Sequence, residues 1–308
     1  ELRNAIRISP NHSGALTALG MVLTRLAKSQ DAILTFRKAL ALDPNSAEAH
    51  LNLGIALADH FNLEGALAEF SEAVRLAPDS AAARYNRGRS LFDLRRNEEA
   101  KAELEAAVRL APDQSAALYL LALAEKQLNR PERSAELLRK VVALDPGSSD
   151  AHYLLGQNLA RLEKPSEAAA HWKRAVEINP NHGEALYNLS RSVNQIGPAE
   201  ARQYRERFAA LQEKRQITER ADTLGNFALA SASARDWEQA YAQFEEAIRV
   251  CGDCRSRGDL HKNLGLIYCR NGDLKSGKRE LRIALKFKPN DPDVLKSLRI
   301  IEEMGEGK

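Results

Sequence analysis

The 308-residue sequence predicts an all-α solenoid of antiparallel helix pairs, and three observations support this prediction. Six prolines stand at positions 10, 44, 78, 112, 146 and 180, so each step is 34 residues. Apolar residues between these prolines follow the helical period. Only 6% of the residues are aromatic, and small residues recur at fixed places in each period. A self-similar period of this length is typical of a solenoid, so length alone does not indicate two globular domains.

Each period divides into two helices. We number the units so that the recurring proline is position 32, and the first complete unit then starts at Ser13. Later units start at Ala47, Ala81, Ser115, Ser149 and Gly183. Apolar residues at positions 4, 7 and 11 predict the first helix, and those at 20, 24, 27 and 30 predict the second. Proline at 32 stops the second helix. Ser46, Ser80 and Ser148 stand where the next helix needs an N-cap.

Small and large residues alternate in a way that favours close packing of the two helices. Positions 8 and 20 are small in nearly every unit, so antiparallel helices can approach closely. A large residue at position 24 fills the space beside that crossing: Phe36, Phe70, Leu104, Leu138 and Trp172. This pattern resembles the tetratricopeptide repeat (TPR) family over nearly the whole chain. The resemblance implies a right-handed superhelix in which the first helices line a concave face. Stacking supplies the core that a single pair lacks.

The units predict about eight repeats and a C-terminal capping helix. Residues 1–12 match the end of an upstream second helix, which suggests that the N-terminus is truncated. Regular repeats 1–5 and the first helix of repeat 6 occupy 13–198. We expect an irregular long helix at 199–220, with a break near Thr218. Repeats 7 and 8 follow at 221–291. The capping helix and tail lie at 292–308, and Asp291 serves as N-cap.

The resemblance places positions 2, 5, 6, 9, 12 and 13 of the first helices on the concave face. Position 5 is tyrosine in four successive units, namely Tyr85, Tyr119, Tyr153 and Tyr187. The other candidate peptide-binding residues are Asn52, Asn86, Arg89, Lys126, Gln157, Arg161, Asn188 and Arg191. Aromatic faces and amides along a groove suit an extended peptide, because asparagine donates and accepts hydrogen bonds at once. The alternative is that these tyrosines only pack between helices, with their hydroxyls in water.

Charge refines the expected ligand. Position 2 is acidic in five units, which favours a ligand with some basic residues: Glu48, Asp150, Glu184, Asp222 and Asp259. The set of residues that clamps C-terminal carboxylates in the TPR family is missing from any three consecutive units. The last unit is basic from Lys275 to Lys288, where Glu280 is the one acidic residue. A solvated helix face explains this, while an acidic partner or nucleic acid is the alternative. The net charge of only +3 disfavours a nucleic-acid binder.

The three cysteines give little support for a metal or redox centre. Cys251 and Cys254 have CxxC spacing, and His261 and Cys269 lie further on. His261 and Cys269 are about two helical turns apart, too far to share one zinc ion. We therefore expect a local disulfide or a pair of free thiols, although a small metal- or redox-responsive module remains an alternative.

The sequence predicts a non-catalytic scaffold that binds a protein or an extended peptide segment in its concave groove. We find no metalloprotease motif, nucleophile elbow or phosphate-binding loop, and we expect no cofactor. The alternative is a docking arm of a larger enzyme or sensor whose catalytic domain lies outside this chain. No apolar run is long enough to span a membrane. We expect a cytoplasmic protein; the truncated start leaves a periplasmic or secreted form open. Oligomeric state and partner identity are not predicted.

Overall fold

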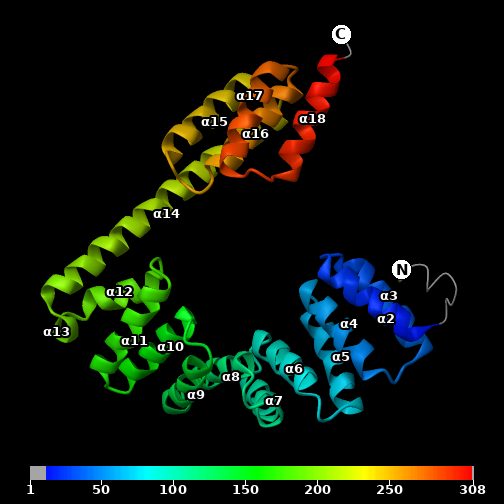
Figure 1. The fold of residues 1–308 in the computed structure, drawn as a ribbon, viewed down its shortest axis with the longest axis vertical. Helices are drawn as coiled ribbons and strands as arrows, with labels where there is room; N and C mark the ends of the chain where they lie inside the picture. The colour runs from blue at the N-terminus through cyan, green and yellow to red at the C-terminus, as the bar shows by residue number, and fades with distance from the viewer. Residues whose placement is uncertain (1–11, 307–308) are drawn as a thin grey trace. The chain divides into compact units, whose positions relative to one another are not determined.

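The computed structural model describes residues 12–306, with side chains described up to residue 303. The expected second-helix remnant at 1–12 lies outside the described residues, except for His12. Within 12–306 every regular element is a helix, and none of these helices is long and apolar enough to cross a membrane. The chain forms two compact units, Glu1–Arg202 and Gln203–Lys308 (Figure 1). We call them the N-terminal and C-terminal units.

Five regular repeats in the N-terminal unit each contain the two predicted helices, which occupy positions 1–13 and 17–30 of the repeat. The pairs are α2 (Ser13–Arg25) with α3 (Ser29–Leu42), α4 (Ala47–Asp59) with α5 (Leu63–Leu76), α6 (Ala81–Asp93) with α7 (Asn97–Leu110), α8 (Ser115–Gln127) with α9 (Pro131–Leu144), and α10 (Ser149–Arg161) with α11 (Pro165–Ile178). The three predicted serine caps are confirmed. Ser46, Ser80 and Ser148 each accept a hydrogen bond from the amide three residues on, at 3.2–3.3 Å.

The two helices of a repeat interlock at the predicted crossing. Gly54 lies so close to Phe70 that a Cβ atom added there would stand 2.5 Å from the ring. Gly20 meets Phe36 in the same way, and Gly156 meets Trp172. At position 20, Ala32 and the equivalent alanines of the next two repeats are fully buried. The small residues therefore set how near the helices come, and the large residue fills the remaining space.

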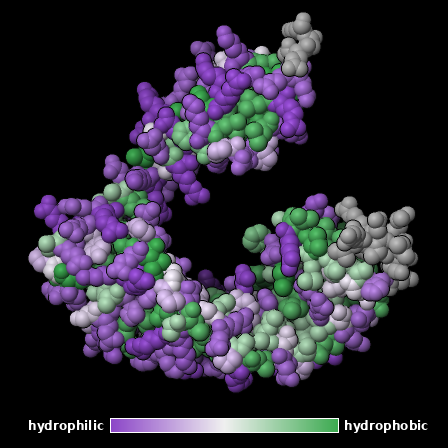
Figure 2. All heavy atoms as spheres, in the orientation of Figure 1, coloured by the Kyte–Doolittle hydropathy of each residue, from purple (hydrophilic) through white to green (hydrophobic). Residues whose placement is uncertain are grey.

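Second helices also pack on the first helix of the next repeat, as α3 does on α4 and α5 on α6. Adjacent first helices contact one another, as in α2 with α4 and α4 with α6. Within the N-terminal unit the first helices lie on the inner side of a curved stack (Figure 1). On the face shown in Figure 2, hydrophobic residues gather over the early repeats of the N-terminal unit, and a further hydrophobic patch lies on the C-terminal unit.

Position 4 is polar in several repeats, so the expectation of an apolar residue there is only partly right. A side chain at position 4 pairs with position 23 of the same repeat, 19 residues on. These pairs are His50–Glu69 at 2.6 Å, Arg84–Glu103 at 3.2 Å, His152–His171 at 3.1 Å and His261–Glu280 at 2.8 Å. Repeat 4 has Leu118 and Leu137 there instead, and both are buried. Polar partners on the second helix thus allow a polar residue at a packing position.

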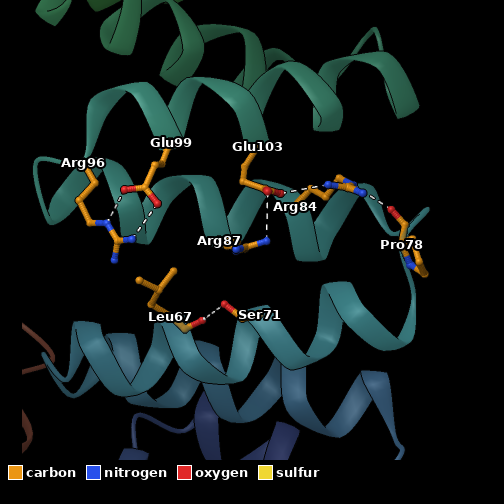
Figure 3. Close-up of polar contacts among 8 residues, drawn as sticks. All are labelled: Leu67, Ser71, Pro78, Arg84, Arg87, Arg96, Glu99 and Glu103. Atoms are coloured by element: carbon orange, nitrogen blue, oxygen red, sulfur yellow. Dashed lines mark hydrogen bonds and ion pairs between the residues drawn. The ribbon is translucent and has the colours of Figure 1, made fainter.

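Two of these position-4 residues, His50 and Arg84, also reach the turn that precedes their repeat. His50 Nε2 lies 3.0 Å from the carbonyl oxygen of Pro44, and Arg84 Nε donates to the carbonyl of Pro78 at 2.8 Å. Figure 3 shows Arg84 between Pro78 and Glu103, with Arg87 on the other carboxylate oxygen of Glu103 at 3.1 Å. Each such residue therefore ties three chain segments together.

The turn between the two helices is left-handed at position 15 of every complete repeat. The residues there are Ala27, Phe61, Arg95, Asn129, Glu163, Arg235 and Gly272. Six of these seven are not glycine, and their φ angles lie between 55° and 63°. This conformation costs a side-chain-bearing residue about 1–2 kcal/mol. The repeats accept the cost because the turn is held by the packed helices on both sides.

Repeat 6 departs from the pattern. Its first helix, α12 (Gly183–Arg191), ends earlier than the expected Gly197, and a short helix α13 (Val193–Ile196) follows. Ser190 and Ser192 donate to backbone carbonyls three and four residues earlier, at 2.6 and 2.9 Å. Serine side chains that bond the helix backbone in this way bend or end helices. Gly197, with φ 84°, then turns the chain into Pro198.

Helix α14 runs without interruption over Pro198–Ser233, so the expected break near Thr218 is wrong. Thr218 does not cap a new helix; its hydroxyl donates to the carbonyl of Lys214 at 2.9 Å within the helix. The expected boundary at 220/221 therefore falls inside one helix. Residues 221–233 take the place of the first helix of repeat 7, where Ala228 packs beside Phe244.

The C-terminal unit continues with α15 (Trp237–Cys251), α16 (Arg257–Arg270), α17 (Leu274–Phe287) and α18 (Pro292–Glu306). Asp291 caps α18 as expected, accepting from the amide of Val294 at 3.1 Å. Val294 and Ile301 of α18 are buried against Leu281 and Ala284. The exposed face of α18 carries Lys296, Arg299, Glu302 and Glu303. A polar outer face is what a terminal cap of a solenoid needs.

Relieving the left-handed turn should stabilise the protein. Arg95 is exposed and has φ 63°, so we expect Arg95→Gly to raise the free energy of unfolding by about 0.5–1 kcal/mol. Asn129→Gly is the matched control, because asparagine already tolerates this conformation and should gain less. Urea denaturation of both variants measures the difference. A loss of stability in Arg95→Gly, or an equal gain in the control, would show that the turn is not strained.

The His152–His171 pair should make stability depend on pH. The facing Nδ1 atoms are 3.1 Å apart, so one ring donates and the other accepts a single proton. Burial lowers the pKa of both rings; Arg174 lowers that of His152 further, and His152 and Arg139 lower that of His171. A hydrogen bond to the Pro146 backbone and then Glu177 oppose the lowering for His152, and Glu167 opposes it for His171. The unfolded chain therefore binds more protons once the pH falls below about 6.5, and the folded state loses stability there.

Replacing both histidines with leucine, the residue of repeat 4 at these positions, removes this proton-linked loss. Between about pH 7.5 and 5.5 we expect the melting temperature of the wild type to fall more than that of the His152→Leu/His171→Leu variant, by on the order of one or two degrees. The remaining histidines are common to both proteins and cancel in the comparison. Equal falls in the two proteins would contradict this account of the pair.

Candidate peptide-binding groove

The twelve candidate residues lie on the first helices α4, α6, α8, α10 and α12 of the N-terminal unit. Tyr85, Tyr119 and Tyr153 are half-buried, while Tyr187 is 42% exposed. None of the four tyrosines is fully enclosed between helices, so each ring presents part of its surface to solvent. The predicted ladder is thus accessible over four consecutive repeats.

Tyr153 is the centre of a polar cluster that spans two repeats. Its hydroxyl accepts a hydrogen bond from Gln157 Nε2, and Gln157 Oε1 accepts one from Lys126 Nζ. Arg161 likewise reaches back one repeat and donates to Asn129 Oδ1. Lys126 and Asn129 belong to repeat 4, whereas the other three residues belong to repeat 5. These three bonds fix the orientation of the five side chains.

Sequence reasoning missed His182, which completes this cluster. His182 is 6% exposed, caps α12 by accepting from the amide of Ala185 at 3.4 Å, and packs on Tyr153 with ring centroids 4.7 Å apart. Its Nε2 lies 3.4 Å from Asp150 Oδ1, at an angle too poor for a hydrogen bond. A signal was present, because Pro-Asn-His precedes both Ser13 and Gly183, and His12 caps α2 in the same manner.

The electrostatic environment differs along each first helix. Burial raises the pKa of Tyr119, and Asp150 at position 2 of the next repeat raises it further. Burial and then Glu184 raise the pKa of Tyr153 in the same way, while the bond from Gln157 opposes them. Each of these tyrosines therefore has a carboxylate from the following repeat nearby.

The opposite ends of the same helices are cationic. Burial lowers the pKa of Lys126, and the nearby Arg161 lowers it further. Carboxylates in the first turn and cations in the last turn also complement the helix dipole, so both sets stabilise the helices themselves. Along the first-helix face, carboxylates therefore lie near the N-terminal ends of the helices, the tyrosines follow them, and cations lie near the C-terminal ends.

The remaining candidates split between the two ends of the ladder. Asn52 and Asn86 donate one amide proton each to a carbonyl of their own helix, at 2.8 Å. These two bonds use neither the second amide proton nor the Oδ1 atom of each side chain. Asn86 and Arg89 border a small recess of about 70 Å³ between α4, α5 and α6. At the other end, the Arg191 guanidinium lies 5.4 Å from the Tyr187 ring centroid and donates to its hydroxyl. Asn188 lies on α12 about one turn before Arg191.

The cysteines form no metal site in this structure. Cys251 and Cys254 are joined by a disulfide, with Cα atoms 4.9 Å apart, and this resolves the choice between a disulfide and free thiols. Cys269 is free, and burial raises the pKa of its thiol. Over residues 12–306, no group of three or more His, Cys, Asp or Glu side chains is placed to hold a metal ion.

The basic stripe of α17 has more acidic neighbours than the expected Glu280. Glu280 is buried and pairs with His261 and Arg279. Glu302 of α18 instead lies 2.9 Å from Lys278 and 3.8 Å from Arg282. Lys288 binds Asp259 at 2.6 Å. Intramolecular pairs thus neutralise part of the charge counted from the sequence.

Comparison with known proteins agrees with this geometry. Models of the family described as Tetratricopeptide repeat match residues 17–81, 85–149 and 149–182. Over 75 residues the chain is 31% identical to the photosystem I assembly protein Ycf3 of Synechococcus sp. (strain CC9605) and to that of Prochlorococcus marinus (strain NATL1A). Each match covers 24% of this chain and 43% of the relative. The chain therefore spans about two fifths of the length of the curated relatives it matches.

Solved structures resemble the stack of helix pairs. MamA (residues 41 to the end) from Desulfovibrio magneticus RS-1 is 26% identical with a TM-score of 0.52, covering 55% of this chain and 96% of that one. YrrB, described as a TPR protein with an unusual peptide-binding site, is 23% identical with a TM-score of 0.55, covering 60% and 96%. Pseudomonas aeruginosa PilF is 22% identical with a TM-score of 0.57, covering 66% and 91%. The last two likenesses concern the fold alone. Because the family models match more than half of the residues, the chain belongs to the tetratricopeptide repeat family.

Proposed function

We propose that this protein is a non-catalytic scaffold that binds an extended peptide segment of a partner protein along the first-helix face of repeats 3–6. The fold and the family support a protein-interaction scaffold in general. The observation that carries the finer proposal is the ordered cluster around Tyr153, where Lys126, Gln157 and His182 fix an accessible ring between two repeats.

The repeat spacing matches the pitch of an extended chain. Neighbouring helices pack about 10 Å apart, and a strand-like peptide advances about 3.3 Å per residue. One repeat therefore spans about three ligand residues, and the four tyrosines span on the order of nine. Rigid aromatic side chains supply contact area at a low cost in conformational entropy, which suits them to this task.

The charge of the groove indicates the composition of the ligand. Asp150 and Glu184 flank Tyr153 and His182, and both carboxylates are largely exposed, at 73% and 69%. They can accept hydrogen bonds from lysine or arginine without the cost of burying a charge. We therefore expect basic residues in the peptide opposite α10 and α12. The partial match to photosystem I assembly proteins adds support for a role in assembling other proteins.

The direct test removes two rungs of the ladder. A peptide would first be selected against the protein from a display library of random nonapeptides, and its Kd measured by fluorescence anisotropy. We expect Tyr119→Ala/Tyr153→Ala to weaken binding at least about tenfold, because two aromatic contacts near the centre of an interface are lost. A version of the peptide with its basic residues changed to glutamate should also bind more weakly.

Two controls separate binding from folding. Phe61→Ala removes an aromatic residue that is 92% exposed in the turn between α4 and α5, outside the first-helix face, and should leave the Kd unchanged. Tyr153→Phe keeps the ring and loses only the hydroxyl that accepts from Gln157, so it should retain most of the affinity. If the double alanine variant is folded by circular dichroism and binds like the wild type, the tyrosines are packing residues and the proposal is wrong.

A further inference from the structure

The loop between α15 and α16 is built differently from the other turns that join repeats. Regular repeats end in a proline turn, whereas here the sequence is Cys-Gly-Asp-Cys, closed by the Cys251–Cys254 disulfide. Gly252 takes a left-handed conformation with φ 53°. Beside this loop lies a cavity of about 350 Å³ between α15, α16 and α17. Its polar lining includes Arg249, Arg257, His261, Tyr268, Arg279 and Glu280.

His261 has lost a partner that its counterpart in repeat 2 retains. Both histidines stand at position 4 and both pair through Nδ1 with a glutamate at position 23. His50 Nε2 lies 3.0 Å from the carbonyl of Pro44 in the preceding turn. The disulfide loop has no equivalent proline turn, and His261 Nε2 is buried with no hydrogen-bond partner among the described residues. The side chain as a whole is only 7% exposed.

A second unpaired nitrogen stands on the same helix face. Arg257 precedes His261 by four residues, so the two side chains are neighbours on α16. Both pack on Phe287, with the Arg257 guanidinium carbon 5.5 Å and the His261 ring centroid 6.1 Å from the Phe287 ring centroid. Arg257 Nη1 is held by the carbonyl of Gly252 and by Asp253, the latter at 3.0 Å. Its Nε atom is buried and unpaired among residues 12–306.

The unpaired Nε of Arg257 calls for an acceptor, and His261 Nε2 does so when both ring nitrogens carry protons. A buried donor without a partner costs about 1–3 kcal/mol, and native proteins rarely leave one. The arginine Nε always carries a proton, so it can only donate. Three arginines line the cavity against two carboxylates, Glu245 and Glu280, and Glu280 is already engaged by His261 and Arg279. Asp253 also pairs with Arg257, so the charges around the cavity are close to balanced, and it is the unused donor of Arg257 Nε that favours an oxyanion, a strong acceptor.

We propose that this cavity binds an oxyanion, the phosphate or carboxylate group of a small molecule or a peptide, at Arg257 Nε and His261 Nε2. With Nδ1–H bonded to Glu280, Nε2 carries a proton only in the imidazolium form. In that form Nε2 can donate to an oxyanion bound in the cavity. The site lies wholly in the C-terminal unit and uses no residue of the tyrosine ladder, so it stands or falls independently of the proposed peptide groove.

The test follows the histidine ring signals by NMR while inorganic phosphate is added to the oxidised, full-length protein. We expect the His261 Cε1–H resonance to shift in a saturable way, with a Kd on the order of 1–10 mM. His50 pairs in the same way with a glutamate, Glu69, but its Nε2 already has a hydrogen-bond partner. Its resonance should therefore stay in place, and it serves as an internal control. A parallel titration with acetate distinguishes a phosphate site from a carboxylate site.

Variants then locate the anion. Arg257→Gln removes the donor and should weaken phosphate or acetate binding at least about tenfold. Arg299→Gln changes an exposed arginine of α18 outside the cavity and should leave the Kd unchanged. The proposal is overturned if neither anion shifts the His261 resonance saturably up to about 50 mM, a concentration that would reveal even weak binding. That result would mean that water alone fills the cavity. The proposal is also overturned if His50 shifts equally, or if Arg257→Gln binds like the wild type.

Discussion

The contact between positions 8 and 24 sets the geometry on which the rest of the structure depends. Gly20, Gly54 and Gly156 leave no room for a Cβ atom against Phe36, Phe70 and Trp172. Such a contact fixes how far apart the two helices lie and how they cross, because packed side chains cannot be compressed. Since the same contact recurs every 34 residues, each pair stacks on the next with the same rotation. A regular curved stack follows without any long-range interaction.

Regular stacking gives every first helix an equivalent place on the inner face. A residue type repeated at one position then becomes a row in space, which is how Tyr85, Tyr119, Tyr153 and Tyr187 form a ladder. The crossing within each pair is formed by positions 8, 20 and 24, so first-helix residues that face inward are free to vary. Because the packing positions and the inward-facing positions are separate, the fold can hold polar clusters such as Lys126–Gln157–Tyr153 without weakening the core.

Features that depend on local spacing could be predicted from the sequence. The ten helices of repeats 1–5 and the caps at Ser46, Ser80, Ser148 and Asp291 follow from residue types at fixed positions. Features that depend on two separate elements could not. The pairs between positions 4 and 23 join two helices, and the role of His182 requires Tyr153 and the start of α12 to meet. Neither contact is visible in the periodicity of one helix.

Two further differences between the sequence-based predictions and the structure have a clear physical origin. Thr218 satisfies its hydroxyl inside α14, so a residue that often caps helices does not end this one. The disulfide loop before α16 replaces a proline turn and leaves His261 Nε2 unpaired, an effect that appears only once the turn is placed over the helix.

The most direct measurement of where the protein binds its ligand is hydroxyl-radical footprinting with and without a selected peptide. The central claim, that ligands lie along the first-helix face, predicts reduced oxidation of Tyr119, Tyr153 and Tyr187. Oxidation of Phe61, which is 92% exposed in a turn outside that face, should not change. Protection of Phe61 or of the second helices, with the three tyrosines oxidised as in the free protein, would contradict the account.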